Sequence, residues 1–172
     1  MRRSTNARFH GFTLMETLIV VAILGLLIAI GVPMWLNSLN RAKQAQTMAN
    51  MREIASAWEA RAADYRAYNA AGAKFQMPSV ALAAPKVETL LVPTYLRALP
   101  RRDAWGHPFD FAIDKQAPGT ATQYAIRSPG RNGKLDGGKK KKYTIGTTTR
   151  FDCDIIYANG VFISYPAGVQ VK

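Results

Sequence analysis

Cysteine and histidine are scarce in this chain. Cys153 is the only cysteine among 172 residues, so an intramolecular disulfide is excluded. With two histidines in all, the sequence contains no zinc-ligand spacing and no nucleophile–base set. It also contains no phosphate-binding glycine loop and no metalloprotease motif. The sequence therefore predicts that the protein is not an enzyme and that a core or a metal stabilises the fold.

Acidic residues are few beside the basic ones. The chain has 11 Asp and Glu against 23 Lys and Arg, a net charge of +12. The N-terminal residues Arg2, Arg3 and Arg8 supply part of the excess, and much of the rest lies in Arg97, Arg101, Arg102 and the run Lys139 to Lys142. Such a surface could attract nucleic acid, anionic lipid head groups or acidic partners, or simply face water. Aromatic residues do not alternate with the basic ones, so the pattern does not favour nucleic acid as a partner.

Charged side chains are entirely missing between Leu18 and Leu36. This stretch, with the apolar residues before it, is long enough for a helix that crosses a bilayer core of about 30 Å. No small-residue cleavage site follows it, because Gly31-Val32-Pro33 leads into Met34 and Trp35. Residues 1–11 are polar and basic, which predicts a cytoplasmic N-terminus and an exported remainder.

The junction at Gly11 identifies the segment more closely. Gly11 followed by FTLMETLIVVAILGLLIAIGVP resembles the prepilin signature of type IV pilins and type II secretion pseudopilins. Glu16, Gly25 and Pro33 occupy the positions where that family has its acidic residue, glycine and proline. The resemblance implies that prepilin peptidase cuts between Gly11 and Phe12 and that Phe12 is then N-methylated.

Three residues of this segment are expected to act in assembly. A carboxylate beside a long apolar run is costly unless it is paired, and the resemblance implies that Glu16 neutralises the Phe12 amine of a neighbouring subunit. A simple helix-dipole role for Glu16 is the alternative. Gly25 and Pro33 both weaken a helix interior. The resemblance implies that the helix unwinds between them in a filament, whereas a membrane kink remains open.

The helix is predicted to continue beyond the membrane. No Pro or Gly occurs from Arg41 to Tyr68, and Gly72 is the expected stop. Apolar residues recur at steps of three and four, tracing one helical face: Met48, Met51, Ala55, Trp58, Ala62 and Tyr65. Only about three heptads carry this pattern, so packing on a domain is favoured over a coiled coil.

The rest of the chain predicts a small antiparallel sheet. Residues 73–104 read as irregular apart from a short helix at Val87–Val92, and strands are expected near Phe109–Ile113 and at Gln123–Arg127. Asp154–Tyr165 reads as a hairpin around Asn159-Gly160. The predicted fold is α+β and pilin-like, with a long helix packed on the sheet. The predicted divisions are a leader (1–11), a transmembrane and polymerisation helix (12–40), an amphipathic helix (41–68) and a globular head (69–172).

The head resembles one branch of the family. DAWGHPFDF and the loop SPGRNGKLDGG are similar to the major pseudopilin of type II secretion. The missing disulfide agrees, since many fibre-forming type IV pilins close their C-terminal region with one. The resemblance implies a filament subunit that spans the bacterial inner membrane once, with its head in the periplasm. Its implied partners are itself, other pseudopilins, prepilin peptidase, and the inner-membrane assembly platform with its ATPase. A type IV pilus pilin, fibre-forming or minor and DNA-binding, is the alternative.

The resemblance also implies that the glycine- and aspartate-rich loop could bind calcium. Calcium prefers six to eight oxygen ligands. The residues that could provide side-chain oxygens are Ser128, Asp136, Asp152 and Asp154. Arg131 and the run Lys139 to Lys142 oppose a divalent cation, so a solvated glycine-rich loop is the alternative.

Three further side chains have structural expectations. Trp105 is expected to anchor the core beneath the sheet. His107 has no metal-ligand spacing around it. Cys153 is expected to be a buried small hydrophobe.

Overall fold

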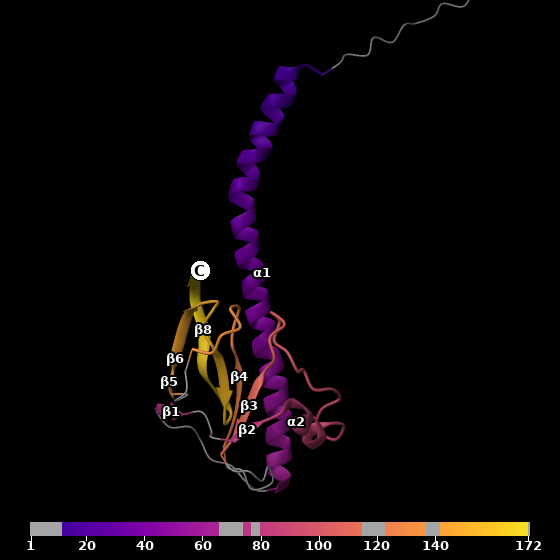
Figure 1. Cartoon of the computed structure of the whole chain (residues 1–172), viewed down its shortest axis with the longest axis vertical. Helices are drawn as coiled ribbons and strands as arrows, with labels where there is room; N and C mark the ends of the chain where they lie inside the picture. The colour runs from indigo at the N-terminus through magenta and orange to yellow at the C-terminus, as the bar shows by residue number, and fades with distance from the viewer. Residues whose placement is uncertain (1–11, 66–73, 77–79, 115–122, 137–141, 172) are drawn as a thin grey trace, which may run out of the picture. The chain divides into compact units, whose positions relative to one another are not determined.

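A computed structural model describes residues 12–65, 74–76, 80–114, 123–136 and 142–171. The chain divides into two compact units, residues 1–39 and residues 40–172. Helix α1 (Leu14–Tyr65) is 52 residues long and contributes to both (Figure 1). Gly11 and the predicted helix stop at Gly72 lie outside the described residues.

Helix α1 begins with a side-chain cap. The amide of Glu16 donates to Thr13 Oγ1 at 3.3 Å, and Thr13 with Glu16 forms the T-x-x-E spacing of a capping box. The helix continues through Pro33. From Leu14 to Leu39 its large apolar side chains are exposed within the chain. By length and composition, α1 is one helix that could cross a membrane.

The second part of α1 carries the predicted apolar face. Met51, Ala55 and Trp58 are buried, and Met48 is partly buried against the same cluster. Ala62 is half-buried, whereas the side chain of Tyr65 lies outside the described residues. The stripe therefore packs on the head, as its spacing predicts.

The head contains a six-stranded sheet in the order β2-β3-β4-β7-β8-β6 (Figure 1). A two-stranded sheet, β1-β5, and helix α2 (Ala84–Leu91) accompany it. The strands are β1 (Lys74–Gln76), β2 (Val80–Leu82), β3 (Asp110–Ile113), β4 (Tyr124–Ser128), β5 (Lys142–Thr144), β6 (Gly146–Arg150), β7 (Ile155–Ala158) and β8 (Val161–Val171).

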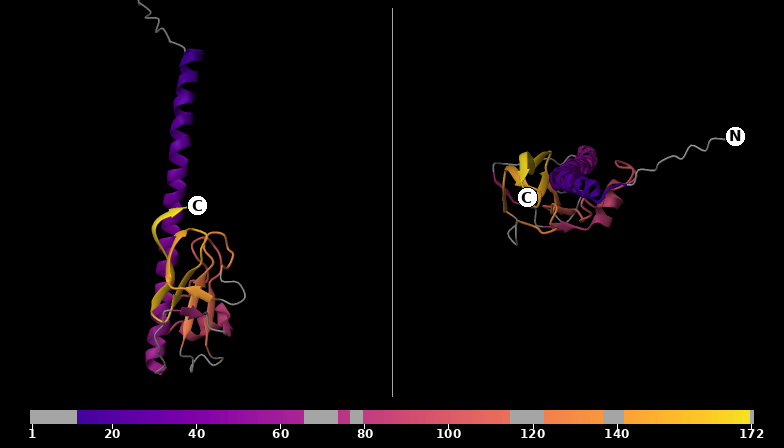
Figure 2. Two further views of the ribbon diagram at one scale, coloured as in Figure 1. Left: turned by 90° about the vertical axis from the view of Figure 1, so that its left-hand side faces the viewer. Right: turned by 90° about the horizontal axis from the view of Figure 1, so that it is seen from above.

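The expected hairpin is present. Strands β7 and β8 pair antiparallel around Asn159 (φ 46°) and Gly160 (φ 88°), the positive φ angles that favour this dipeptide in tight turns. Strand β8 continues to Val171, beyond the predicted end at Tyr165. The side view in Figure 2 shows β8 extending along α1, and Gln44 Nε2 donates to Gln170 Oε1 at 3.2 Å there.

The expectation of a purely antiparallel sheet is wrong at one pair. Strand β6 runs parallel to β8. The chain reverses direction twice between them, first from β6 into β7 and again through the β7–β8 turn, so β6 and β8 point the same way. The sheet is therefore mixed.

The prediction of an irregular segment over residues 73–104 is also wrong in part. The segment contributes β1 and β2, and α2 starts at Ala84 instead of Val87. Pro85 lies in the first turn of α2, where its missing N–H removes no helical hydrogen bond. Pro85 therefore belongs to the helix that it was expected to precede.

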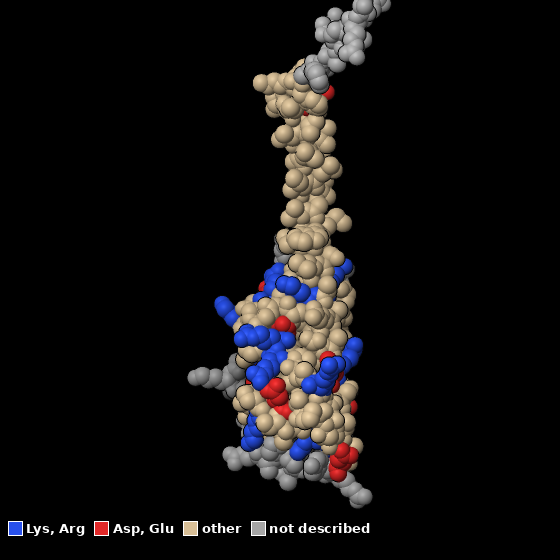
Figure 3. Space-filling view, turned by 90° about the vertical axis from the view of Figure 1, so that its right-hand side faces the viewer, with Lys and Arg blue, Asp and Glu red and all other residues tan. Residues whose placement is uncertain are grey.

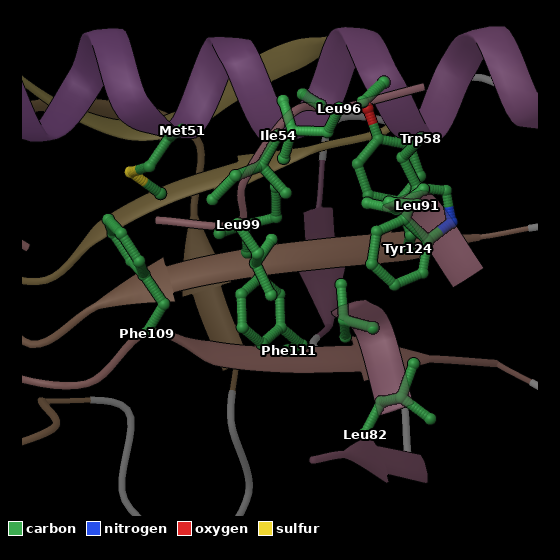
Figure 4. Packing of buried hydrophobic residues seen from close by; sticks show 14 of the residues in the cluster. Met51, Ile54, Trp58, Leu82, Leu91, Leu96, Leu99, Phe109, Phe111 and Tyr124 are labelled. Atoms are coloured by element: carbon green, nitrogen blue, oxygen red, sulfur yellow. The ribbon is translucent and has the colours of Figure 1, made fainter. Parts of the chain in front are cut away.

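Aromatic stacking joins α1 to the sheet. The rings of Trp58 and Tyr124 lie 5.5 Å apart and 9° from parallel, and Trp58 also stacks on Phe111 at 6.5 Å. Figure 4 shows Met51, Ile54 and Trp58 of α1 directed toward these sheet residues. Since Tyr124 is on β4 and Phe111 on β3, one side chain of α1 fixes two strands.

Replacing Trp58 with Ala should destabilise the head by about 3–5 kcal/mol, because it empties the centre of this stack. Urea unfolding of the full chain in detergent, followed by circular dichroism, measures the change. Glu53→Ala is the matched control, an exposed position on the same helix. Equal stability of the two variants would contradict the stated role of the stack.

Candidate functional site

The processing and assembly residues lie at the start of α1. Phe12 is exposed and precedes the helix, and Glu16 is exposed in its first turn. Within the described residues, Glu16 forms no ion pair. Its carboxylate is thus accessible to a cationic group of another molecule.

The predicted weak points of α1 have open surroundings. A Cβ added at Gly25 would meet no atom within 4 Å, and Pro33 lies inside a continuous helix. The structure of this single chain shows α1 wound between them. The predicted unwinding concerns a filament and therefore stays a prediction.

Asp103 organises the turn of the DAWGHPF segment. Its side chain is buried, and Oδ1 accepts the amides of Trp105 at 3.0 Å and His107 at 2.8 Å. Oδ2 accepts the hydroxyl of Ser128 at 2.7 Å. The sequence analysis singled out Trp105 and missed Asp103, although an aspartate before a glycine-containing turn is a recognisable signal.

The aromatic and imidazole rings of this turn hold neighbouring segments. Trp105 packs against the core cluster but is only half-buried, and its Nε1 donates to Asn40 Oδ1 at 3.4 Å. His107 Nε2 lies 3.2 Å from the carbonyl oxygen of Arg131. A Cβ on Gly133 would approach the His107 ring to 2.7 Å, so this contact requires glycine.

Of the four residues proposed as calcium ligands, only Asp136 and Asp154 contact each other. The amides of Asp136 and Asp154 each donate to the other's carboxylate, at 3.1 and 3.2 Å. Asp152 is bound through both oxygens by Arg131 at 2.8 and 3.1 Å, and Ser128 donates to Asp103. Among the described residues, no group of three His, Cys, Asp or Glu side chains could hold a metal ion.

Asp154 nevertheless has an unusual environment. Its Oδ2 accepts the Tyr143 hydroxyl at 2.6 Å, whereas its buried Oδ1 has no hydrogen-bond partner in the described part of the chain. Burial raises the pKa of Asp154 above its usual range. A buried carboxylate oxygen without a donor, beside a second carboxylate, is a donor set that a hard cation prefers.

Arg127 and Tyr143 extend this network into the sheet. Arg127 is buried, pairs with Asp110 and donates to the Tyr143 hydroxyl at 2.6 Å. Burial, with the hydrogen bond to Asp154, raises the pKa of Tyr143 to about 12, so the phenol stays protonated. The sequence analysis missed both residues, because Tyr143 follows the lysine run and β5 carries no strand signal of its own.

Cys153 departs from its expected burial. It is half-buried in the turn before β7, not a fully buried core residue. Partial burial still raises the pKa of its thiol. The core position near this strand is filled by Ile155 and Ile156 instead.

Comparison with known proteins matches two family models to the chain. The prokaryotic N-terminal methylation motif covers residues 6–32, and the type II secretion system protein G family covers residues 34–148. No solved structure gives a significant match.

Similar proteins carry related names. The type II secretion system core protein G of Pseudomonas aeruginosa is 31% identical over 79% of this chain and 92% of its own length. Its namesake from Aeromonas hydrophila is 28% identical over 75% and 80%. The type IV major pilin protein PilA of Myxococcus xanthus is 42% identical, over only 30% of this chain and 24% of its own. The N-terminal signature, the long helix on a small sheet and these matches together show that the chain belongs to the protein G family of type II secretion pseudopilins.

Proposed function

We propose that this pseudopilin is processed between Gly11 and Phe12, inserted in the inner membrane, and polymerised through α1 into a filament. The observation that carries the proposal is the apolar surface of α1 from Leu14 to Leu39, which no described part of the chain covers. Apolar surface on that scale requires lipid or other subunits around it. The subunit's work is then mechanical, and it catalyses no reaction.

Glu16 gives the assembly its register. An exposed carboxylate at the start of an apolar helix carries a large desolvation penalty in lipid. Pairing with the free amine of a neighbour's Phe12 removes that penalty, and it does so only where two helices are correctly staggered. The proposed partners that bring subunits to this position are prepilin peptidase, the inner-membrane assembly platform and its ATPase.

Replacing Gly11 with Ala should block processing, because the peptidase is proposed to recognise the small residue before the cut. The full-length precursor should then accumulate in the membrane, as measured by intact mass. Gly25→Ala is the matched glycine control, since its surroundings leave room for a methyl group. Mature-length protein from the Gly11→Ala variant would refute the cleavage site.

Replacing Glu16 with Ala should leave processing intact and reduce assembly beside wild-type subunits by roughly tenfold or more, the effect of losing one desolvated ion pair. Counting labelled variant subunits in sheared filaments measures incorporation. Glu53→Ala removes an exposed carboxylate of the same helix and should incorporate normally. Equal incorporation of both variants would remove the pairing role of Glu16.

A type IV pilus is the weaker alternative. The Myxococcus pilin is similar over less than a third of this chain, whereas the Pseudomonas core protein G is similar over most of it. The head that distinguishes the two classes therefore supports the secretion pseudopilus.

Calcium binding remains a proposal, now confined to two side chains. Asp136 and Asp154 are the carboxylates that would hold the ion, with the unpartnered Oδ1 of Asp154 as one ligand atom. When bound, calcium would neutralise this acidic pair and fix the loop before β7. Asp152 is excluded from the proposed set because Arg131 holds both of its oxygens.

Adding calcium at a hundredfold excess over its dissociation constant should stabilise the head by about 2.7 kcal/mol. Thermal unfolding with calcium, and again after adding a chelator, measures the shift. Asp154→Asn should abolish it, while Asp152→Asn should retain a shift. An unchanged midpoint in the wild type would dismiss calcium and leave the solvated loop.

A further inference from the structure

Several exposed basic residues of the head lie near the start of its part of α1. Three contacts bring distant segments beside the first turns of α1 within the head. Thr47 Oγ1 accepts the amide of Ala104 at 3.1 Å, and Gln44 pairs with Gln170 at 3.2 Å. His107 in turn contacts the carbonyl oxygen of Arg131. The loop at 101–108 and the end of β8 therefore lie beside residues 44–47 of α1, and the loop at 130–136 lies beside the loop at 101–108.

Five exposed or half-buried basic residues belong to these segments. Arg41 and Lys43 lie on α1 itself, and Arg150 ends β6, where it pairs in register with Val171 of β8. Together with the two loop residues they form what we call the basic collar: Arg41, Lys43, Arg102, Lys134 and Arg150. Figure 3 shows Lys and Arg side chains at this end of the head and further along it.

Acidic side chains do not neutralise the collar. Asp103 is buried and accepts two hydrogen bonds from its own turn and one from Ser128 of β4. Asp152 forms an ion pair with Arg131, which is outside the collar. The carboxylates of Asp136 and Asp154 each accept a hydrogen bond from the other residue's amide. In the described ranges, none of the five collar residues forms an ion pair. Hydrogen bonds leave the charges of Asp103, Asp136 and Asp154 in place, but the five collar cations outnumber these three carboxylates, so the net charge at this end is positive.

The position of Arg41 and Lys43 along α1 indicates that the collar faces a membrane surface. Arg41 lies two positions after Leu39, where the apolar stretch ends. A span of about 20 residues fills the hydrocarbon core, so Arg41 and Lys43 reach the head-group layer when that stretch is in a bilayer. Each basic residue near an anionic membrane surface strengthens attachment about fivefold, within a Debye length.

We propose that the basic collar docks the head on anionic phospholipid head groups before the subunit enters the filament. The ligand class is the phosphate of lipids such as phosphatidylglycerol. This inference rests on the membrane insertion proposed above. Docking holds the head against the bilayer, and leaving the membrane for the filament requires these contacts to break.

The test uses the full chain in nanodiscs of phosphatidylcholine alone or with about one third phosphatidylglycerol, the anionic surface being the variable. Hydrogen exchange of the amides at 102–107 and 167–171 should be several-fold slower in the anionic discs. The protection should disappear when salt rises to about 0.5 M, because screening then shortens the reach of the charges. Failure of the chain to insert in either disc would instead refute the membrane insertion.

A charge-matched pair of variants separates the collar from net charge. Arg41→Gln/Arg150→Gln should lose most of the protection. Lys86→Gln/Arg97→Gln removes the same charge from exposed positions and should keep it. Lys86 lies on α2, toward the opposite end of the head (Figure 1), and Arg97 follows Tyr95, which contacts Asp64 far along α1.

Two results would overturn the proposal. One is equal exchange in neutral and anionic discs. The other is protection of the same amides by duplex DNA in neutral discs together with no effect of phosphatidylglycerol, which would assign the collar to nucleic acid.

Discussion

The packing of Trp58 against Tyr124 and Phe111 determines what the rest of this structure can do. It ties the second part of α1 to the centre of the sheet, so any force on the helix is transmitted to the whole head. The buried cluster around Trp58 contains residues from α1, α2, β2, β3, β4 and β7. A long helix without this attachment would be a membrane segment with a loosely tethered domain.

The same helix passes through two environments. Up to Leu39 its large apolar side chains are exposed among the residues that the structure describes, and from Gln44 onward one face is buried in the head. The boundary is marked by Asn40, Arg41 and Lys43, polar residues suited to the head-group layer. The proposed filament assembly and the proposed lipid docking therefore use adjacent parts of α1. On assembly, the subunit would exchange its contacts with lipid for contacts with other subunits.

Much of the fold could be predicted from local signals. Helical spacing identified the buried face of α1, and Asn159-Gly160 identified the β7–β8 turn, because both signals depend on neighbouring residues. The parallel β6–β8 pair could not be predicted, because it follows from two chain reversals. Strand β5 could not be predicted either, because it begins at the last residue of a lysine run. The calcium prediction failed to anticipate that Arg131 would bind Asp152, a contact between residues 21 positions apart. Buried networks such as Arg127–Tyr143–Asp154 join separate strands and leave no local pattern.

The most direct test of the account is the N-terminus of the protein extracted from its native membrane. Intact mass combined with N-terminal sequencing identifies both the first residue and its modification. The account predicts a mature chain that begins at N-methylated Phe12. A chain that still carries residues 1–11 would contradict it, because a precursor amine cannot neutralise Glu16 at the start of α1 in a neighbouring subunit.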